Sequence, residues 1–403
     1  MKRQFLKYHL TLAVILISMI AYAQWTQLVS PTTNHLLSVH FPDANTGYAV
    51  GLADTVYKTI NAGVNWTALP VNTLILYQGF TSVRFTSIDT GYLAGWNGQL
   101  LKTNNGGITW HPLLSGVVYD LWSIFFSSPN IGYVVGDDGI TGAGIILKTI
   151  NGGTSWSLQT FSTYVTLSSV VFTDSLNGHI VGGNQTILRT TDGGTTWTSQ
   201  LGDCQFRSVC FPSANIGYAL GTGYSVMKTT NGGVTWDTLH CATNSNYSIY
   251  FTSIDTGYIT SGDFGAHIIK TVDGGASWHT QYSSLNNLRS TYFTNANTGY
   301  VVGYNGTILK TTNSGGGYIG IEELTDEQEI NLYPNPTSEY LTVRAEGEKI
   351  KELRVINVLG EEVLKKKLND YTETIDVSSL AKGIYFLEVK TEKGISIKKL
   401  IKE

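Results

Sequence analysis

Two arginines, Arg207 in FRSVCF and Arg289 in LRSTYF, occupy the same place in two related segments of the chain. Guanidinium groups that converge from equivalent positions can bind an anion, because each offers several N–H donors to a carboxylate. A local ion pair, for example with Asp203, is the competing interpretation. The two arginines are therefore a candidate ligand-binding pair, with the local ion pair as the alternative.

Aromatic side chains stand beside glycine in four short Gly-rich turns. Their flat faces suit stacking on a sugar ring or a peptide. Aromatic residues in such loops also fold back over a neighbouring sheet, so the sequence leaves both roles open. The four residues are Trp96 in GWNG, Tyr224 in TGYS, Phe264 in GDFG and Tyr304 in GYNG.

Six aspartates are candidates for glycoside hydrolysis, which needs two carboxyl groups at a defined separation. No pair among them can be selected from sequence. They are Asp54, Asp120, Asp137, Asp138, Asp203 and Asp263.

Other chemistry has less support. The 8 histidines show no spacing typical of a metal site, no G-x-S-x-G segment occurs, and the Gly-rich turns lack the strand-to-helix setting of a phosphate loop. A net charge of −4 with 14% charged residues provides no basic surface for nucleic acid. We expect no metal, no cofactor and no nucleic-acid partner. We favour a binding protein over an enzyme.

A repeat must position these residues. The motif TTDGGTTW and its relatives recur along the chain, and their tryptophans lie 39 to 46 residues apart. Each unit contains four short stretches typical of β-strands, with Gly-Tyr opening the second. Four strands per period of about 40 residues predict an all-β, seven-bladed propeller over residues 24–320. The tryptophans are Trp66, Trp110, Trp156, Trp197, Trp236 and Trp278, and Tyr318 stands in a seventh, decayed copy.

The motif is predicted to be a turn between the third and fourth strands of each unit. Asp192 can bond its own backbone, and Gly193 and Gly194 supply positive φ angles, before Trp197 packs on the blade. Asp273 and Trp278 stand at the matching positions of a later copy. A calcium loop would need several carboxylates, whereas each copy has one Asp or none.

Seven cations recur at one position just before this motif. Duplication of a blade repeats the same residue around the propeller, so a regular position does not by itself indicate a binding site. We therefore predict that the aliphatic stems of these side chains lie along the blades, rather than that the charges form a binding ring. The seven are Lys58, Lys102, Lys148, Arg189, Lys228, Lys270 and Lys310.

The motif resembles the Asp-box (BNR) repeat, and the whole unit is similar to propellers of the photosystem II stability/assembly factor type. The resemblance covers roughly Trp25 to Tyr318 and specifies a fold rather than a function. For function, our first hypothesis is a non-catalytic binding or scaffold module for an extracellular glycan or protein. The alternative is a glycoside hydrolase, because xyloglucanases and sialidases carry the same box.

The two ends of the propeller complement each other. The segment beginning Trp25-Thr26 matches a fourth strand with no strands before it, while the last unit, from Leu288, lacks a fourth strand. We predict that the N-terminal strand completes the last blade and removes an open sheet edge.

The first residues predict export. Lys2, Arg3 and Lys7 precede an apolar run that ends near Ala23, the pattern of a signal peptide over residues 1–23. No later segment is apolar enough to span a membrane.

After a linker over residues 321–329, charged residues become frequent, and short alternating strands predict a small Ig-like β-sandwich over residues 330–403. This segment resembles the type A sorting domain of the type IX secretion system of Bacteroidota. Tyr333-Pro334-Asn335-Pro336 opens it and a basic strand ends it. The resemblance implies the secretion machinery as a partner and a secreted or cell-surface location.

Three cysteines leave at least one unpaired. Cys204 and Cys241 fall in successive loops on one face, so a disulfide between them is one hypothesis.

Overall fold

The computed structural model describes residues 25–71, 79–159, 165–241, 243, 245–263, 265–316, 330–357, 361–391 and 395–403. The chain divides into two compact units, Met1–Ile319 and Gly320–Glu403, and each is considered by itself. Across the described ranges, no helix has the length and hydropathy needed to cross a membrane. The signal peptide predicted over residues 1–23 lies outside the described residues.

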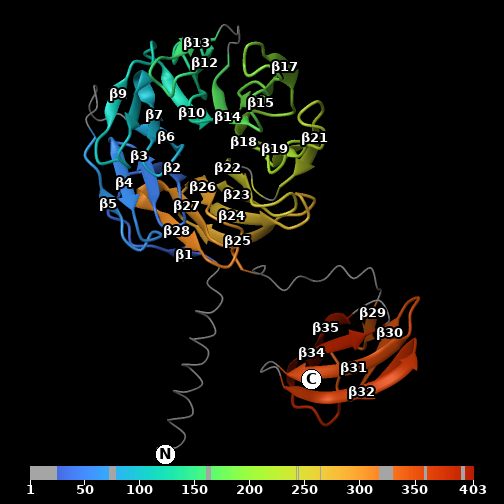
Figure 1. The fold of residues 1–403 in the computed structure, drawn as a ribbon. Helices are drawn as coiled ribbons and strands as arrows, with labels where there is room; N and C mark the ends of the chain where they lie inside the picture. Colours follow the sequence, from blue (N-terminus) through green and yellow to red (C-terminus); the bar gives the residue numbers. More distant parts are fainter. Residues whose placement is uncertain are drawn as a thin grey trace, which may run out of the picture. The chain divides into compact units, whose positions relative to one another are not determined.

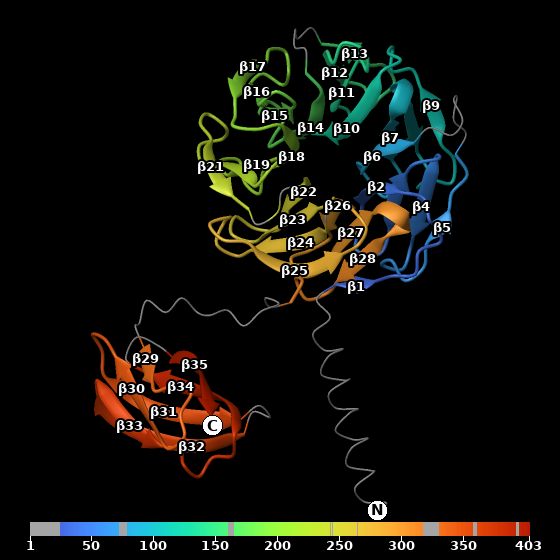
Figure 2. The same ribbon diagram turned by 180° about the vertical axis from the view of Figure 1, so that it is seen from behind.

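The first unit is a seven-bladed β-propeller, in which four-stranded antiparallel sheets surround a central axis (Figure 1). The first strand of each blade lies nearest the axis, and the fourth lies at the rim (Figure 2). Blades 1 to 3 consist of β2 (Leu36–His40), β3 (Gly47–Gly51), β4 (Thr55–Thr59) and β5 (Thr67–Ala68); β6 (Phe80–Phe85), β7 (Gly91–Gly95), β8 (Leu100–Thr103) and β9 (His111–Leu113); and β10 (Asp120–Phe126), β11 (Gly132–Asp137), β12 (Gly144–Thr149) and β13 (Ser157–Leu158).

Blades 4 to 6 repeat the same order of strands. They consist of β14 (Leu167–Phe172), β15 (Gly178–Gly182), β16 (Thr186–Thr190) and β17 (Thr198–Leu201); β18 (Phe206–Cys210), β19 (Gly217–Gly221), β20 (Ser225–Thr229) and β21 (Asp237–His240); and β22 (Asn246–Phe251), β23 (Gly257–Ser261), β24 (Ala266–Thr271) and β25 (His279–Ser284).

Blade 7 joins the two ends of the propeller. It contains β26 (Leu288–Phe293), β27 (Gly299–Gly303) and β28 (Ile308–Thr311), and its fourth strand is β1 (Thr26–Gln27). Strand β1 pairs antiparallel with β28, with Thr26 opposite Lys310. The predicted closure is therefore confirmed, and no sheet edge is left open at this seam.

The hydrophobic cores lie between neighbouring blades. The second strand of every blade is buried along its whole length because both of its faces are covered. Tyr48 of blade 1, for example, stacks on Phe85 of blade 2 with ring centroids 3.9 Å apart. Each blade thus depends on its neighbours for burial.

A ring of seven serines connects the innermost strands. Each serine Oγ accepts a hydrogen bond from a backbone N–H of the next blade, at 3.2 to 3.3 Å. The ring includes the seam, where Ser290 of blade 7 accepts from Val39 of blade 1. The seven are Ser38, Ser82, Ser123, Ser169, Ser208, Ser248 and Ser290.

The second unit packs two antiparallel sheets around one core that includes Leu341, Leu353 and Leu387. The first sheet contains β29 (Ile330–Tyr333), β30 (Tyr340–Ala345) and β33 (Thr372–Asp376). The second contains β32 (Glu362–Asp370), β31 (Ile350–Asn357), β34 (Gly383–Lys390) and β35 (Ile395–Lys402).

The opening and closing segments of this unit bind each other. The Asn335 side chain donates from Nδ2 to the carbonyl of Lys399 at 2.7 Å and accepts from the N–H of Ile401 at 2.9 Å. An asparagine side chain thus pairs with the last strand as a backbone amide would. The Tyr-Pro-Asn-Pro segment and the basic C-terminal strand therefore form one structural element.

Candidate functional site

The innermost strand of every blade carries a β-bulge near its first residue. Strand pairing shifts by one residue at the same place in all seven blades. A bulge leaves its extra residue out of the ladder and redirects its side chain. The seven bulge residues, called the mouth ring below, are Leu37, Thr81, Trp122, Ser168, Arg207, Tyr247 and Arg289.

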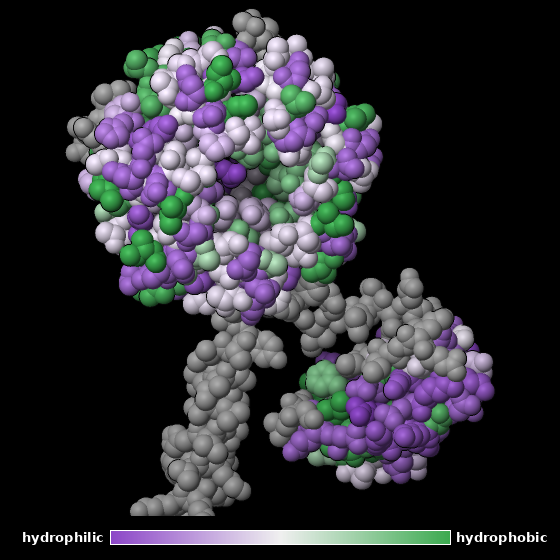
Figure 3. Space-filling view, in the orientation of Figure 1, coloured by the Kyte–Doolittle hydropathy of each residue, from purple (hydrophilic) through white to green (hydrophobic). Residues whose placement is uncertain are grey.

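The mouth ring encloses a cavity at the propeller axis. All seven of its residues, together with Thr166, line a space of ≈ 330 Å³. The space-filling view in Figure 3 shows the hollow at the centre of the propeller. The repeat therefore builds the walls of this cavity, while differences between the copies decide its chemistry.

Arg207 and Arg289 meet at Tyr247. The Arg207 guanidinium carbon lies 4.5 Å from the Tyr247 ring centroid, and that of Arg289 lies 4.0 Å from it. Arg289 also lies 5.6 Å from the ring of Tyr304. Blades 5, 6 and 7 thus place two cations against one aromatic ring, an attractive arrangement for each of them.

Neither arginine of this cluster is neutralised by a described carboxylate. The ion pairs found between described residues include neither Arg207 nor Arg289. Asp203, the partner considered from sequence, accepts hydrogen bonds from the hydroxyls of Ser225 and Thr238 at 2.8 and 2.7 Å. The Nη1 atom of Arg207 is buried without a hydrogen-bond partner.

Tyr247 is positioned by its own hydrogen bond. Its hydroxyl donates to Asp263 at 3.2 Å, and Asp263 in turn accepts from the Asn287 side chain at 3.0 Å. Sequence reasoning missed Tyr247 and Trp122 as site residues. The signal was present, since both occupy the position of Arg207 in their own blades.

The four predicted aromatic residues have different surroundings. Tyr304 stacks on His35, with centroids 4.0 Å apart, and contacts the mouth ring through Arg289. Trp96 is half-buried in the matching turn η1 (Trp96–Gly98), as Tyr304 is in η2 (Tyr304–Gly306). Tyr224 is 57% exposed. Phe264 lies outside the described residues.

The turn motifs have the geometry of structural turns. Asp192 accepts from the N–H of Thr196 at 2.9 Å and from its hydroxyl at 2.6 Å, and Gly193 and Gly194 have φ angles of 68° and 77°. These bonds, led by that of the Thr196 hydroxyl, lower the pKa of Asp192 to about 2. Trp197 packs edge-to-face on Phe172, with centroids 6.0 Å apart.

Another copy of the motif repeats this geometry. Asp273 accepts from the N–H of Ser277 at 3.0 Å, and Trp278 packs on Phe251 with centroids 6.1 Å apart. In the part of the chain that the structure describes, no group of three His, Cys, Asp or Glu side chains could hold a metal ion.

The seven repeated cations join neighbouring blades. Each donates a hydrogen bond of 2.6 to 3.0 Å to a carbonyl in the turn motif of the next blade. The sequence indicated only that the stems lie along the blades, and the contact of each charged head with a carbonyl was not predicted. The pairs are Lys58 with Gly106, Lys102 with Gly152, Lys148 with Gly193, Arg189 with Gly232, Lys228 with Gly274, Lys270 with Ser314 and Lys310 with Ala62.

Comparisons with known proteins agree with this architecture. Residues 17–114 and 153–207 match the family described as photosynthesis system II assembly factor YCF48, and residues 331–403 match the secretion system C-terminal sorting domain. The chain combines a propeller similar to YCF48 with a sorting tail. The tail is of the type IX kind, which implies secretion or attachment at the cell surface.

Solved structures show the same fold for the YCF48-like propeller. A structure of YCF48 bound to D1 peptide has a TM-score of 0.61 at 18% identity, over 72% of this chain and 98% of that one. YCF48 from Cyanidioschyzon merolae has a TM-score of 0.58 at 22% identity, over 71% and 98% of the two chains. An ancestral GH74 enzyme has a TM-score of 0.59 at 14% identity, over 93% and 63%. No curated protein matches the sequence.

Five of the six candidate aspartates accept hydrogen bonds in loops or on strands, namely Asp120, Asp137, Asp138, Asp203 and Asp263. Hydrogen bonds led by that of the Thr141 hydroxyl lower the pKa of Asp138. Burial raises the pKa of Asp203, but the hydroxyls of Thr238 and Ser225 outweigh it and the net shift is downward. Asp120 and Asp137 lie opposite each other on β10 and β11, and Asp137 accepts from the Trp122 indole at 2.6 Å. Asp54 adopts a positive φ of 54°.

The predicted disulfide is not formed. Cys204, Cys210 and Cys241 are all free cysteines. Cys241 is buried and contacts Asn246 and the carbonyl of Thr243, both at 3.3 Å. Its sulfur is thus held within its own loop, and burial raises the pKa of each of the three thiols.

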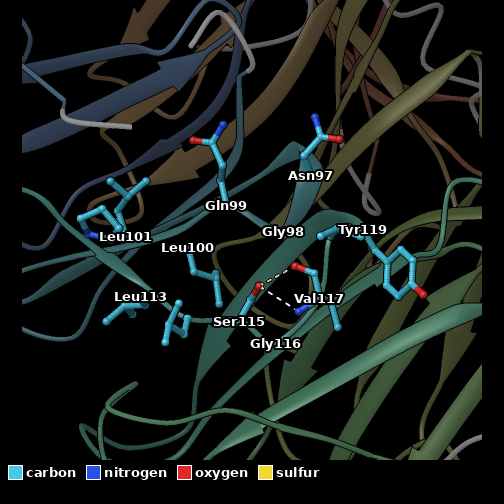
Figure 4. Close-up of a pocket in the computed structure, with 13 residues that line it drawn as sticks. Asn97, Gly98, Gln99, Leu100, Leu101, Leu113, Ser115, Gly116, Val117 and Tyr119 are labelled. Carbon is cyan, nitrogen blue, oxygen red and sulfur yellow. Dashed lines mark hydrogen bonds between the residues drawn. The ribbon is translucent and has the colours of Figure 1, made fainter. Parts of the chain in front are cut away.

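A second hollow lies in blade 2 of the YCF48-like propeller. It has a volume of ≈ 440 Å³, and its lining carries no charged side chain. Figure 4 shows Leu100, Leu101 and Leu113 at this pocket, with Ser115 hydrogen-bonded to Val117. Because this lining contains no cation, the mouth ring is the better candidate for an anionic ligand.

Proposed function

We propose that this exported propeller is a non-catalytic binding module that receives an acidic group of an extracellular peptide or glycan at the mouth ring. The observation that carries the proposal is the convergence of Arg207 and Arg289 on Tyr247 without a carboxylate partner. Partly buried cations lose hydrogen bonds to water, and an anionic ligand replaces those hydrogen bonds.

The surroundings of the two arginines suit a ligand larger than a simple ion. Trp122 and Tyr247 line the same cavity, and Tyr304 lies beside Arg289. Aromatic faces next to guanidinium groups can hold the body of a peptide or a sugar while the arginines hold its charge. The similar structure of YCF48 bound to D1 peptide supports a peptide ligand, although D1 peptide is the ligand of that protein.

A glycan and peptide array probed with the full chain tests the proposal. We expect hits that carry a carboxylate, with binding weakened about tenfold or more in Arg207→Ala and in Arg289→Ala, because charged hydrogen bonds are worth about 1.5–3 kcal/mol. Arg344→Ala is the matched control, since it removes one exposed arginine from the other unit. Hits that survive both mouth-ring substitutions would contradict the proposal.

A glycoside hydrolase is the second candidate, supported by the pair Asp120 and Asp137 and by the likeness to the GH74 enzyme. Hydrolysis needs two carboxyl groups that act together, and these two are Cα partners on adjacent strands beside Trp122. Turnover of a plant or mucin polysaccharide that disappears in Asp137→Asn would favour the enzyme. Turnover unchanged in Asp120→Asn and Asp137→Asn would remove this pair from consideration.

Export is proposed to use both ends of the chain. Residues 1–23 act as a signal peptide removed after Ala23, residues 24–320 form the propeller, 321–329 the linker, and 330–403 the segment that the secretion machinery recognises. A reporter fused to residues 321–403, behind a signal peptide, should reach the medium or the surface of a host with a type IX system. Retention of that fusion in the periplasm would argue against the assignment.

A further inference from the structure

The axial channel contains a second cavity at the other end of the innermost strands. It has a volume of ≈ 370 Å³, and side chains of all seven innermost strands line it. The fifth residue of each of these strands, counted from the residue before the bulge, belongs to this lining. These seven residues, called the inner ring below, are His40, Arg84, Phe125, Val171, Cys210, Tyr250 and Tyr292.

Arg84 is the cation of the inner ring, and no described carboxylate pairs with it. It takes part in none of the ion pairs found between described residues. Its guanidinium carbon lies 4.9 Å from the centroid of the Phe125 ring. Burial lowers the pKa of Arg84, while the phenols of Tyr292 and Tyr250 act in the opposite direction. An arginine nevertheless stays protonated near neutral pH.

The other titratable groups of the inner ring are neutral near neutral pH. Burial, with the nearby charge of Arg84, holds the pKa of His40 well below its ordinary value. Burial also raises the pKa values of Cys210, Tyr250 and Tyr292. Phe125 and Val171 complete the ring. The cavity therefore holds one positive charge that its own walls do not balance.

The walls offer both a hydrogen-bond donor and apolar surfaces. The hydroxyl of Tyr250 donates to the carbonyl of Phe293 at 3.2 Å, whereas the Tyr292 hydroxyl makes no hydrogen bond to a described residue. The rings of Tyr250 and Tyr292 lie 5.7 Å apart, and His40 lies 4.8 Å from Tyr292. A guanidinium, an unused phenol and several aromatic rings thus share one small enclosure.

We propose that the inner ring binds a small organic carboxylate, whose carboxylate group pairs with Arg84 and the Tyr292 hydroxyl while its apolar body contacts Phe125 and Tyr250. A planar carboxylate matches the two parallel N–H groups of a guanidinium. The aromatic walls distinguish this ligand class from a hydrated inorganic anion. The site differs from the mouth ring in its residues and lies about 10 Å further along the strands, from the rise of three strand residues.

Titration calorimetry of the full chain with benzoate, acetate and sulfate tests this site. We expect benzoate to bind best, since it combines a carboxylate with an apolar ring. Arg84→Met keeps the length of the side chain and removes the charge, and it should weaken benzoate binding about tenfold or more. Tyr292→Phe should weaken it less, and Arg344→Met, which removes an exposed arginine of the other unit, should leave it unchanged.

Two results would overturn the proposal. Equal benzoate affinity in the native chain and in Arg84→Met would show that the carboxylate is not at Arg84. Binding of sulfate without benzoate, or of none of the three probes, would show that the cavity is not a carboxylate site. If Arg84→Met fails to fold, Arg84→Lys provides the same comparison, because a lysine keeps the charge but loses the two-pronged geometry and should also bind benzoate more weakly.

Discussion

Trp25 packs edge-to-face against Phe293, with ring centroids 5.9 Å apart and an interplanar angle of 87°. The same arrangement joins the motif tryptophan to a phenylalanine of its own blade elsewhere, as in Trp66 with Phe41. In blade 7, a tryptophan from the N-terminus therefore takes the place of the missing motif tryptophan.

Trp25→Ala should destabilise the propeller by about 3–5 kcal/mol, as expected for truncation of a buried aromatic side chain. Trp25 is 4% exposed, and the pairing of β1 with β28 follows directly after it. Urea unfolding followed by tryptophan fluorescence measures the change. Thr26→Ala is the control, because Thr26 is exposed and should change stability little. If Trp25→Ala is as stable as Thr26→Ala, the N-terminal strand does not close the propeller. A chain lacking residues 24–34 that is as stable as the native chain would lead to the same conclusion.

Ser290→Ala should cost about 1 kcal/mol by leaving the N–H of Val39 without its acceptor at the seam between blades 7 and 1. Ser123→Ala is its counterpart inside the ring, where the serine accepts from Val170. If the seam is equivalent to the other junctions, the two midpoints of thermal unfolding should fall together. A loss in Ser123→Ala without one in Ser290→Ala would mark the seam as the weaker junction.

The architecture could be predicted from the sequence because every repeat carries the same pattern of strands and turns. The motif around Asp192 predicts the turn, the four strand-like stretches of each unit predict the strands, and the unmatched segment beginning at Trp25 predicts the closure. Each of these features depends on residues close together in the chain, or on a comparison between copies of one unit.

The site was only partly predictable because it depends on backbone register. Arg207 and Arg289 were singled out by their shared position, but the bulge that places Tyr247 between them is a shift in strand pairing that residue types do not announce. The role of the repeated lysines was missed for a similar reason. A backbone carbonyl acceptor cannot be recognised from the types of side chain in a sequence. The hydrogen bond from Lys148 to the carbonyl of Gly193 was therefore not predicted.

Tyr133 and Lys148 should show coupled contributions to stability. Both donate to the carbonyl of Gly193 in the next blade, at 2.7 and 2.6 Å. Tyr133→Phe and Lys148→Met each leave one donor, so each should cost about 1 kcal/mol, whereas the double variant leaves a buried carbonyl unpaired. We expect the double variant to lose more than the sum, by about 0.5 kcal/mol or more in a urea double-mutant cycle.

Tyr224→Phe is the control for this cycle, because its side chain is 57% exposed. It should change the free energy of unfolding little. Additive losses in Tyr133→Phe and Lys148→Met would show that the two donors do not share one acceptor in solution.

His179 should make the propeller sensitive to acid. It stands where six blades have tyrosine, is 1% exposed, and burial followed by the charge of Arg189 lowers its pKa to about 3. Because the folded pKa lies below the unfolded value of about 6.5, the unfolded chain binds more protons as the pH falls below that value. Stability is then lost progressively from about pH 6.5 downward, by about 2 kcal/mol at pH 5 relative to pH 7 from this residue.

His179→Tyr should remove this part of the acid sensitivity, since the phenol does not titrate between pH 5 and pH 7. His40 is also buried with a lowered pKa, so a residual loss in the same direction should remain. The reciprocal variant Tyr133→His is the matched control and should add acid sensitivity to a neighbouring blade. Guanidinium chloride unfolding at pH 5 and pH 7 measures all three chains. A pH dependence that His179→Tyr leaves unchanged would mean that His179 is already protonated, or solvated, in the folded propeller.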